Sequence, residues 1–187
     1  MTIKELFAQL HTLEHALVVI DGPCGSGKTT LAEHLITQCP GYTLVHMDDY
    51  YVPFREKTTE RLSIPGGNAD SERLISEVIT PWLHGERALV RPYRVHTDTF
   101  LSPYEVPAGG SILLEGSYSG VPCLSTHAAM KLFVLVDPVT HKNRLYHRNP
   151  ATYPLFLEKW IPLENHYFSY YGLPDASWNV LPGDRMI

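Results

Sequence analysis

The sequence predicts an α/β fold in which helices cover both faces of a mostly parallel sheet. Short apolar runs rich in β-branched residues alternate along the chain with segments of helical periodicity. Strands that are buried on both faces have such continuous apolar runs, because neither side meets water. The chain of 187 residues is long enough for one such domain with a sizeable core. We therefore expect a single domain over residues 1–187.

The strands of this sheet are predicted from apolar runs that end in polar or glycine residues. The run at 88–90 is the shortest, and the run at 178–181 is a candidate for the last strand. The segments expected to be strands are 16–20, 42–47, 88–90, 111–116, 131–137 and 178–181.

The helices are predicted from apolar residues at spacings of three and four. An amphipathic helix is expected over 3–14, and others at 30–36, 71–83 and 138–148, the last begun by Asp137 and Pro138. A longer helix at 151–171 should be bent or interrupted near Pro162, because proline lacks the amide donor of a helix interior.

Between the first strand and the next helix lies the most informative motif of the chain. Residues 22–29 fit G-x-x-x-x-G-K-[ST] at every fixed position, and we call them the phosphate loop. Its glycines let backbone N–H groups turn inward around a polyphosphate, and the helix N-terminus adds donors and partial positive charge. The residues expected to bind ATP are Gly22, Pro23, Cys24, Gly25, Ser26, Gly27, Lys28, Thr29 and Thr30.

Two side chains of the phosphate loop have more specific predicted roles. Lys28 should be exposed and should reach the β- and γ-phosphates, and the Thr29 hydroxyl should bind Mg²⁺. ATP and Mg²⁺ are therefore the expected cofactors.

Carboxylates follow two other strands and should meet the loop at the carboxyl edge of the sheet. Asp48, with Asp49 beside it, follows the 42–47 strand, and Glu115 ends the 111–116 strand. Asp48 is the candidate base that accepts a proton from an attacking hydroxyl, and it is also a candidate Mg²⁺ group with Glu115. The alternative for Asp48 and Asp49 is an ordinary polar turn at a strand end.

Arg144 and Arg148 lie one turn apart on the 138–148 helix. They could reach over the phosphates as a lid and neutralise charge on the transferring phosphoryl group. The alternative is a solvated helix face.

The composition of the chain disfavours nucleic acid and membranes as partners. The formal net charge of −5 does not favour binding to nucleic acid, and no apolar run approaches membrane-spanning length. Three cysteines make no disulfide framework, so we expect a reducing cytoplasm. The expected partners are ATP and a small-molecule acceptor, with a homo-oligomer left open.

Further motifs in a fixed order resemble the uridine kinase-like group of P-loop nucleoside and small-metabolite kinases. They are the phosphate loop, 48–51 (Asp-Asp-Tyr-Tyr), 67–70 (Gly-Asn-Ala-Asp), 91–93 (Arg-Pro-Tyr), 114–116 (Leu-Glu-Gly) and the 144–148 helix. The resemblance spans nearly the whole chain. It implies a three-layer, nucleoside-kinase-like P-loop NTPase fold with a core of five parallel strands.

The resemblance also implies roles for individual residues. Asp48 matches the catalytic aspartate, Tyr51 a substrate-side aromatic residue, Asp70 the acid that binds ribose hydroxyls, and Tyr93 a residue lining the nucleoside pocket. Arg144 and Arg148 match the lid arginines approximately. An aspartate before a helix is also a favoured N-cap, which is the alternative for Asp70.

The chain departs from uridine kinases where they read the nucleobase. Residues 71–73 are Ser-Glu-Arg in place of His-Pro-Asp, and Val95 and Asp98 stand where an aromatic residue and a histidine are expected. His96 could replace that histidine, or it is a solvated loop residue. We therefore expect weak or absent activity on uridine itself.

The sequence thus predicts an ATP-dependent kinase that transfers the γ-phosphoryl group to a hydroxyl of a small, nucleoside-like metabolite. A kinase of pantothenate, a sugar phosphate or another small alcohol is the alternative, because Arg73, Arg91 and Arg94 would suit an anionic acceptor. A non-catalytic nucleotide-binding regulatory module is an alternative of another class.

Overall fold

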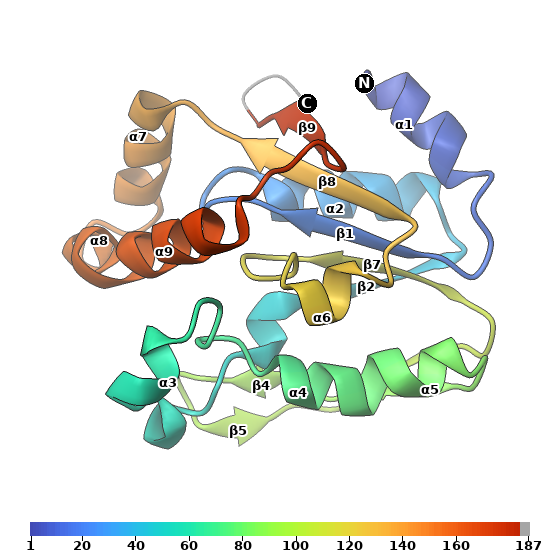
Figure 1. Cartoon of the computed structure of the whole chain (residues 1–187), viewed down its shortest axis with the longest axis horizontal. Helices are drawn as coiled ribbons and strands as arrows, with labels where there is room; N and C mark the ends of the chain where they lie inside the picture. The colour runs from blue at the N-terminus through green and yellow to red at the C-terminus, as the bar shows by residue number, and fades with distance from the viewer. Residues whose placement is uncertain (184–187) are drawn as a thin grey trace.

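A five-stranded sheet, all parallel, forms the centre of the protein. The computed structural model describes residues 1–183, and residues 184–187 of the predicted domain lie outside the described residues. The strand order is β2-β7-β1-β8-β9 (Figure 1). The strands are β1 (Leu17–Asp21), β2 (Tyr42–His46), β7 (Ser111–Glu115), β8 (Met130–Leu135) and β9 (Asn179–Pro182). The predicted α/β fold with five parallel strands is therefore confirmed.

Strands β1 and β7, next to each other inside the sheet, are buried along their whole length, as their apolar sequences predict. Their register pairs Ile20 with Glu115, and β2 pairs His46 with the same Glu115. Three strands therefore end at one level, and the segments that follow them meet at one edge of the sheet.

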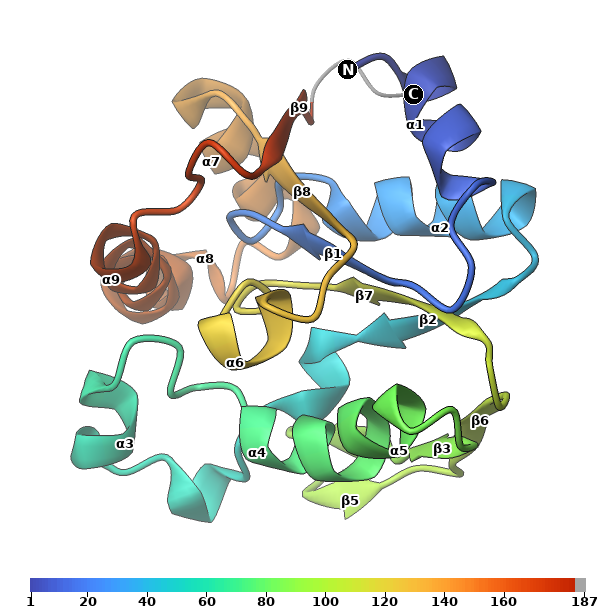
Figure 2. The same ribbon diagram turned by 45° about the vertical axis from the view of Figure 1, so that its right-hand side comes forward.

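Helices α1 (Ile3–Leu10) and α2 (Lys28–Gln38) cover one face of the sheet, and Figure 2 shows α2 running along it. Their apolar residues pack with side chains of the strands in a single core cluster, to which α1 contributes Leu6 and Leu10. A capping box between Thr2 and Glu5 fixes the start of α1.

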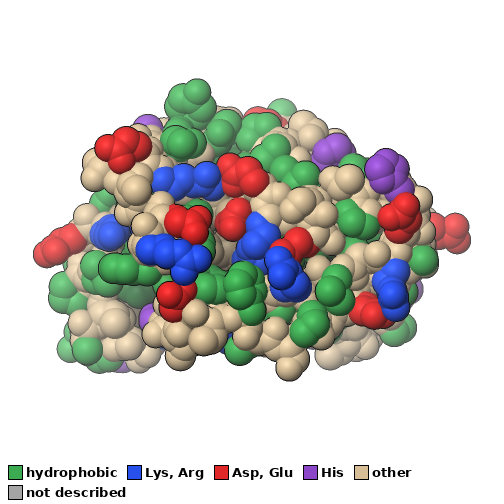
Figure 3. Space-filling model, turned by 90° about the horizontal axis from the view of Figure 1, so that it is seen from below, with side chains coloured by type: hydrophobic (Ala, Val, Ile, Leu, Met, Phe, Trp, Pro, Cys, Tyr) green, Lys and Arg blue, Asp and Glu red, His purple; other side chains and the backbone are tan. Residues whose placement is uncertain are grey.

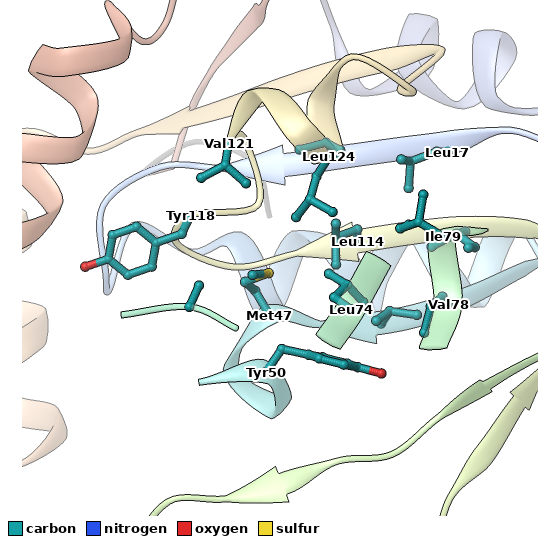
Figure 4. Packing of buried hydrophobic residues seen from close by; sticks show 14 of the residues in the cluster. Leu17, Met47, Tyr50, Leu74, Val78, Ile79, Leu114, Tyr118, Val121 and Leu124 are labelled. Atoms are coloured by element: carbon teal, nitrogen blue, oxygen red, sulfur yellow. The ribbon is translucent and has the colours of Figure 1, made fainter. Parts of the chain in front are cut away.

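A second core cluster lies on the opposite face (Figure 4). Leu17 and Leu114 of the sheet pack there against Leu74 and Ile79 from below and Leu124 from α6. The elements on this side are α4 (Ser71–Leu74), a π-helical turn (Ile75–Ile79), α5 (Thr80–Leu83), α6 (Pro122–Ser125) and α9 (Ile161–Tyr171).

The carboxyl ends of the strands point toward α7 (Pro138–Arg148), α8 (Tyr153–Leu155) and α9 (Figure 1). A π-helical turn (Phe156–Trp160) joins α8 to α9 just before Pro162, and the other π-helical turn precedes Pro81 in the same way. Proline has no N–H for the i−4 carbonyl, so the helix changes register there. The predicted interruption near Pro162 is confirmed in this form.

Several predicted boundaries are wrong. The first helix ends at Leu10, because residues 11–15 turn into β1. The 88–90 segment is a strand, β3 (Ala88–Val90), but it pairs antiparallel with β6 (Tyr104–Val106) outside the central sheet. The elements that the sequence did not predict include α3 (Thr59–Ser63), β6, α6 and the hairpin of β4 (Tyr93–Arg94) and β5 (Thr99–Phe100). These pieces are too short to have a detectable period.

Among the described residues, no helix combines the length and the apolar character needed to cross a membrane.

Candidate active site

The phosphate loop leaves β1 and turns sharply into α2. Gly22 has φ +141° and Gly27, the N-cap of α2, has φ +104°, which are values that side chains disfavour. A Cβ at Gly22 would also lie 2.3 Å from the carbonyl oxygen of Val134. The glycines are therefore required by backbone torsion and by the close approach of β8.

The loop presents a set of unused backbone donors. No hydrogen bond within residues 1–183 uses the N–H groups of Gly25, Gly27, Lys28, Thr29 or Thr30. Unpaired N–H groups at a helix N-terminus, next to left-handed glycines, suit the oxygens of a polyphosphate. The residues present thus fit the nucleotide that the motif predicts.

Lys28 is not exposed, contrary to the sequence-based expectation. Its side chain is 6% exposed, and Nζ donates to the carbonyl oxygens of Gly22 (2.8 Å) and Pro23 (2.9 Å). The hydroxyl of Ser117 lies 3.4 Å away. The long side chain folds back over the loop because an ammonium group needs acceptors, and the loop carbonyls supply them.

Glu115 joins the ends of two strands to the phosphate loop. Its buried carboxylate accepts hydrogen bonds from the Thr29 hydroxyl at 3.3 and 3.4 Å, and from Nδ1 of His46 at 2.6 Å. The bond to Glu115 raises the pKa of His46. His46 was not predicted as a site residue, although its register opposite Glu115 follows from aligning the two strand ends.

Asp48 and Tyr51 follow β2 and line a cavity of about 920 Å³ together with Lys28, Thr29 and Glu115. Burial and the carboxylates of Asp48 and Glu164 raise the pKa of Tyr51, so its hydroxyl keeps its proton beside them.

No cluster of three His, Cys, Asp or Glu side chains that could hold a metal occurs within residues 1–183. Mg²⁺ needs no such cluster, because it keeps several waters and takes one or two carboxylates with substrate phosphates. The oxygen donors of Thr29, Glu115 and Asp48 line one cavity and fit that pattern.

A carboxylate from α9 also reaches the phosphate loop. Glu164, 4% exposed, accepts from the N–H of Cys24 at 2.9 and 3.2 Å and from the Ser117 hydroxyl at 2.7 Å. Burial and this carboxylate raise the pKa of the Cys24 thiol, which therefore stays protonated. Sequence reasoning missed Glu164 and Ser117, because 140 residues separate Glu164 from its loop partner.

A second buried acid, Asp21, ties the start of the loop to the same helix. Its carboxylate accepts from the N–H of Gly22 (2.6 Å) and Gly120 (2.8 Å), and from the Tyr167 hydroxyl (2.7 Å). Burial nevertheless raises the pKa of Asp21 to about 6.

The two predicted lid arginines differ in their contacts. The Arg144 guanidinium donates to the carbonyl oxygens of Ser26 and Gly183, both at 3.0 Å, so it braces the loop. Arg148, one turn further along α7, is exposed and lines the large cavity. Within residues 1–183, Arg144 therefore hydrogen-bonds the backbone of the loop, and Arg148 does not.

The residues predicted for the acceptor side are divided between two cavities. Tyr51, Asp70 and Tyr93 line a cavity of about 230 Å³, whereas His96 lines the large one, which Tyr51 also borders. Asp98, at the position of the expected histidine, accepts a 2.6 Å hydrogen bond from Tyr93.

The carboxylate of Asp70 already has partners within the chain. It caps α4 by accepting from the Arg73 N–H at 3.1 Å, and its other oxygen accepts from Nε of Arg73 at 3.2 Å. The capping role that the sequence left open is present, and binding of an acceptor by Asp70 stays a prediction.

The arginines near Asp70 belong to a network of ion pairs. Glu77 accepts from Arg73 at 3.4 Å and from Nε of Arg91 at 2.8 Å. Figure 3, a view from below of the face that carries α3, α4 and the β4–β5 hairpin, shows acidic and basic side chains close together. Arg73 and Arg91 are thus compensated internally, which removes the basis for reading them as sites for an anionic acceptor.

Comparison with family models finds no match to this sequence. Comparison with curated proteins also finds no match.

Solved structures do resemble the chain. A possible uridine kinase from Bacillus stearothermophilus aligns over 94% of this chain and 96% of its own, with 18% identity and a TM-score of 0.66. A protein proposed to be a fructose transport system kinase from Silicibacter sp. TM1040 aligns over 97% and 100%, with 20% identity and a TM-score of 0.71.

A third similar structure is YFH7 from Saccharomyces cerevisiae, proposed to be a P-loop kinase with a circular permutation. It aligns over 96% of this chain and 98% of its own, with 11% identity and a TM-score of 0.67. Identities this low carry the fold and no substrate. Together with the glycine-rich loop at the carboxyl edge of a parallel sheet, they show that the chain has the uridine kinase-like fold of P-loop kinases.

Proposed function

We propose that the protein is an ATP-dependent kinase that phosphorylates a hydroxyl group of a small metabolite. The observation that carries this proposal is one cavity bordered by the free amides of the phosphate loop, by the Thr29–Glu115 pair and by Asp48. Phosphate-binding groups and a candidate base thus border the same space, as transfer to an alcohol requires.

In this proposal the amides of Gly25, Gly27 and Lys28 bind the β- and γ-phosphates of ATP. Lys28 exchanges the carbonyl oxygens of Gly22 and Pro23 for phosphate oxygens. Thr29, Glu115 and Asp48 would hold Mg²⁺, which when bound neutralises charge on the phosphates.

Asp48 accepts the proton of the acceptor hydroxyl as its oxygen bonds to the γ-phosphorus. The bond from that phosphorus to the β–γ bridging oxygen breaks, and ADP leaves with the bonding electron pair. Arg148, exposed on α7 at the border of the cavity, supplies positive charge to the transferring group.

The sequence motifs indicate only the chemical class of the acceptor. A nucleoside-like metabolite is the first candidate, and pantothenate, a sugar phosphate or another small alcohol is the second. A nucleotide-binding regulatory module is the alternative of another class, which Asp48 beside the phosphate loop disfavours.

The experiment is a measurement of ADP formation with Mg²⁺ and ATP, with and without pooled nucleosides, sugars, polyols, hydroxy acids and sugar phosphates. A kinase forms ADP only when a pool contains its acceptor. Nucleotide binding with no acceptor-dependent ADP in any pool would favour the regulatory module.

A further inference from the structure

Lys57 borders the large cavity and lies against two aromatic rings. Its Nζ is 5.3 Å from the ring centroid of Tyr51 and 5.2 Å from that of Trp160. Tyr51 follows the strand that carries Asp48 toward the site, and Trp160 precedes α9. Ring faces attract a cation but do not neutralise it, so Lys57 keeps an uncompensated charge at the cavity wall.

Arg55 and Arg73, which line the small cavity, have carboxylate partners, whereas Lys57 has none within residues 1–183. Within residues 1–183, Lys57 forms no ion pair with a carboxylate, whereas Arg55, Arg73 and Arg91 each do. Burial, with a smaller contribution from Lys159, lowers the pKa of Lys57 to about 8. A cation held in this way gains more from an anionic ligand than an ion-paired arginine does.

A second polar group on the same wall is an amide whose oxygen has no partner among the described residues. Asn68 is 6% exposed, and its Oδ1 accepts no hydrogen bond from residues 1–183. The carbonyl oxygen of Asn68 accepts from the N–H of Val52 at 3.0 Å, and Tyr51 pairs with Ala69, so Asn68 is fixed beside Tyr51. It lines the large cavity with Lys57. Buried acceptors are normally satisfied, and within residues 1–183 no donor reaches this one.

We propose that Lys57 and Asn68 form the subsite that recognises the phosphoryl acceptor, and that this acceptor is a small alcohol carrying an anionic group. Lys57 binds the carboxylate or phosphate of that alcohol, and Asn68 accepts a hydrogen bond from a second hydroxyl. The inference rests on the proposed kinase function. Of the acceptors proposed for that kinase, it selects an anionic alcohol over a neutral nucleoside.

The charged groups around the subsite favour an anionic group at Lys57 and a reacting hydroxyl at Asp48. Lys57 faces the rings of Tyr51 and Trp160, and Lys159 lies next to Trp160 on the same π-helical turn. Asp48, His96 and Glu164 border the same cavity. Asp48 would repel a bare anion, so the anionic group belongs at Lys57 and the reacting hydroxyl at Asp48.

The test compares two pools in the ADP assay. One pool holds neutral alcohols (nucleosides, sugars and polyols), and the other holds hydroxy acids, pantothenate and sugar phosphates. Hydroxy acids and sugar phosphates are then assayed separately to distinguish carboxylate from phosphate. The variants are Lys57→Met, Lys57→Arg and, as the matched control, Lys159→Met, which removes a charge 4.9 Å from the same Trp160 ring but outside the cavity.

We expect ADP formation with the anionic pool. Lys57→Met should raise KM for the anionic acceptor about 10- to 100-fold, Lys57→Arg should largely restore it, and Lys159→Met should change it less than about twofold. The KM for ATP should hold in all three. In the wild type, kcat/KM for the anionic acceptor should fall above about pH 8, and in Lys57→Arg it should stay level.

Asn68 has its own variant. Asn68→Ala should raise KM for the acceptor about tenfold. Loss of Oδ1 should not lower the melting temperature, because that oxygen forms no hydrogen bond within residues 1–183. An unchanged KM would remove Asn68 from the subsite.

Two outcomes separate the inference from the proposed function. Activity with the neutral pool alone, unaffected by Lys57→Met, would overturn the anionic acceptor and leave the kinase standing. A rise in the KM for ATP in Lys57→Met would assign Lys57 to the phosphates and also overturn the subsite. No ADP formation with either pool would contradict the kinase itself.

Discussion

The phosphate side and the acceptor side of the candidate site are built in different ways. The phosphate side uses backbone N–H groups at the end of β1, fixed by glycine torsions and by the N-terminus of α2. The acceptor side uses side chains from separate loops, and many of these pair with each other, as Arg73 does with Asp70 and Glu77. A phosphate site made of backbone groups can be predicted from a short motif. The partners of side chains cannot, because they depend on which loops the fold brings together.

This contrast has a functional counterpart. A phosphate cradle of main-chain groups binds the same chemistry in any protein that has the motif. The acceptor side can change its specificity by exchanging single side chains, as Val95 and Asp98 illustrate by departing from the uridine kinase pattern. Substitutions on the phosphate side should therefore affect the reaction with every acceptor, and those on the acceptor side should discriminate among acceptors.

The largest effect is expected where the two sides meet, at Asp48. Asp48→Asn keeps the shape of the side chain but removes the proton acceptor, so kcat should fall about 10²- to 10⁴-fold. Steady-state kinetics and ATP binding should be measured beside Asp49→Asn, a matched change at the next residue. Loss of ATP affinity with kcat preserved would make Asp48 a metal-binding group only.

Lys28→Ala should come next, because it removes the ammonium group that contacts the loop carbonyls of Gly22 and Pro23. We expect a loss of about 10²- to 10³-fold in kcat with every acceptor. Lys142→Ala, an exposed change on α7, is the control. Turnover close to that of the wild type would contradict the assignment of this loop to ATP.

A third test concerns the stability of the phosphate side at Asp21. Because burial raises its folded pKa from 3.8 to about 6, the folded state takes up this proton first as pH falls. The contribution of Asp21 to the free energy of unfolding should therefore increase by about 3 kcal/mol between about pH 7 and pH 3. It should be lost again as pH rises through about 6.

Chemical denaturation of the wild type and of Asp21→Asn at several pH values isolates this group from the other carboxylates. The difference between the two free energies of unfolding should grow in favour of the wild type at acidic pH. A difference that is independent of pH would show that the three donors to Asp21 offset its burial.

The smallest effect is expected on the acceptor side, at Asp70. Asp70→Ala should lower the free energy of unfolding by about 1 kcal/mol, because α4 loses its cap, and Asp70→Asn should cost less. Thermal denaturation measures both changes. If the KM for the acceptor rises in Asp70→Asn while ATP affinity holds, the carboxylate also binds substrate.

The sequence by itself determined the elements whose causes are local. The apolar runs required a parallel sheet, and α7 was predicted with the bounds 138–148 that the structure has, because Asp137 and Pro138 signal its start. The phosphate loop followed from strand, glycine and helix in succession, and β2 and β7 each end one residue before the predicted end. These features depend on neighbours within a few residues, so the order of residues is sufficient.

Only the tertiary structure decided which distant groups meet. It brought Glu164 onto the N–H of Cys24, turned Lys28 back onto the loop and used Arg144 as a brace, and within residues 1–183 it gave Lys57 no carboxylate partner. Each outcome depends on the packing of α7 and α9 and of the 52–70 segment around the carboxyl edge of the sheet. A buried charge takes whichever partner lies within hydrogen-bond distance, and that distance is set by the fold rather than by separation along the chain.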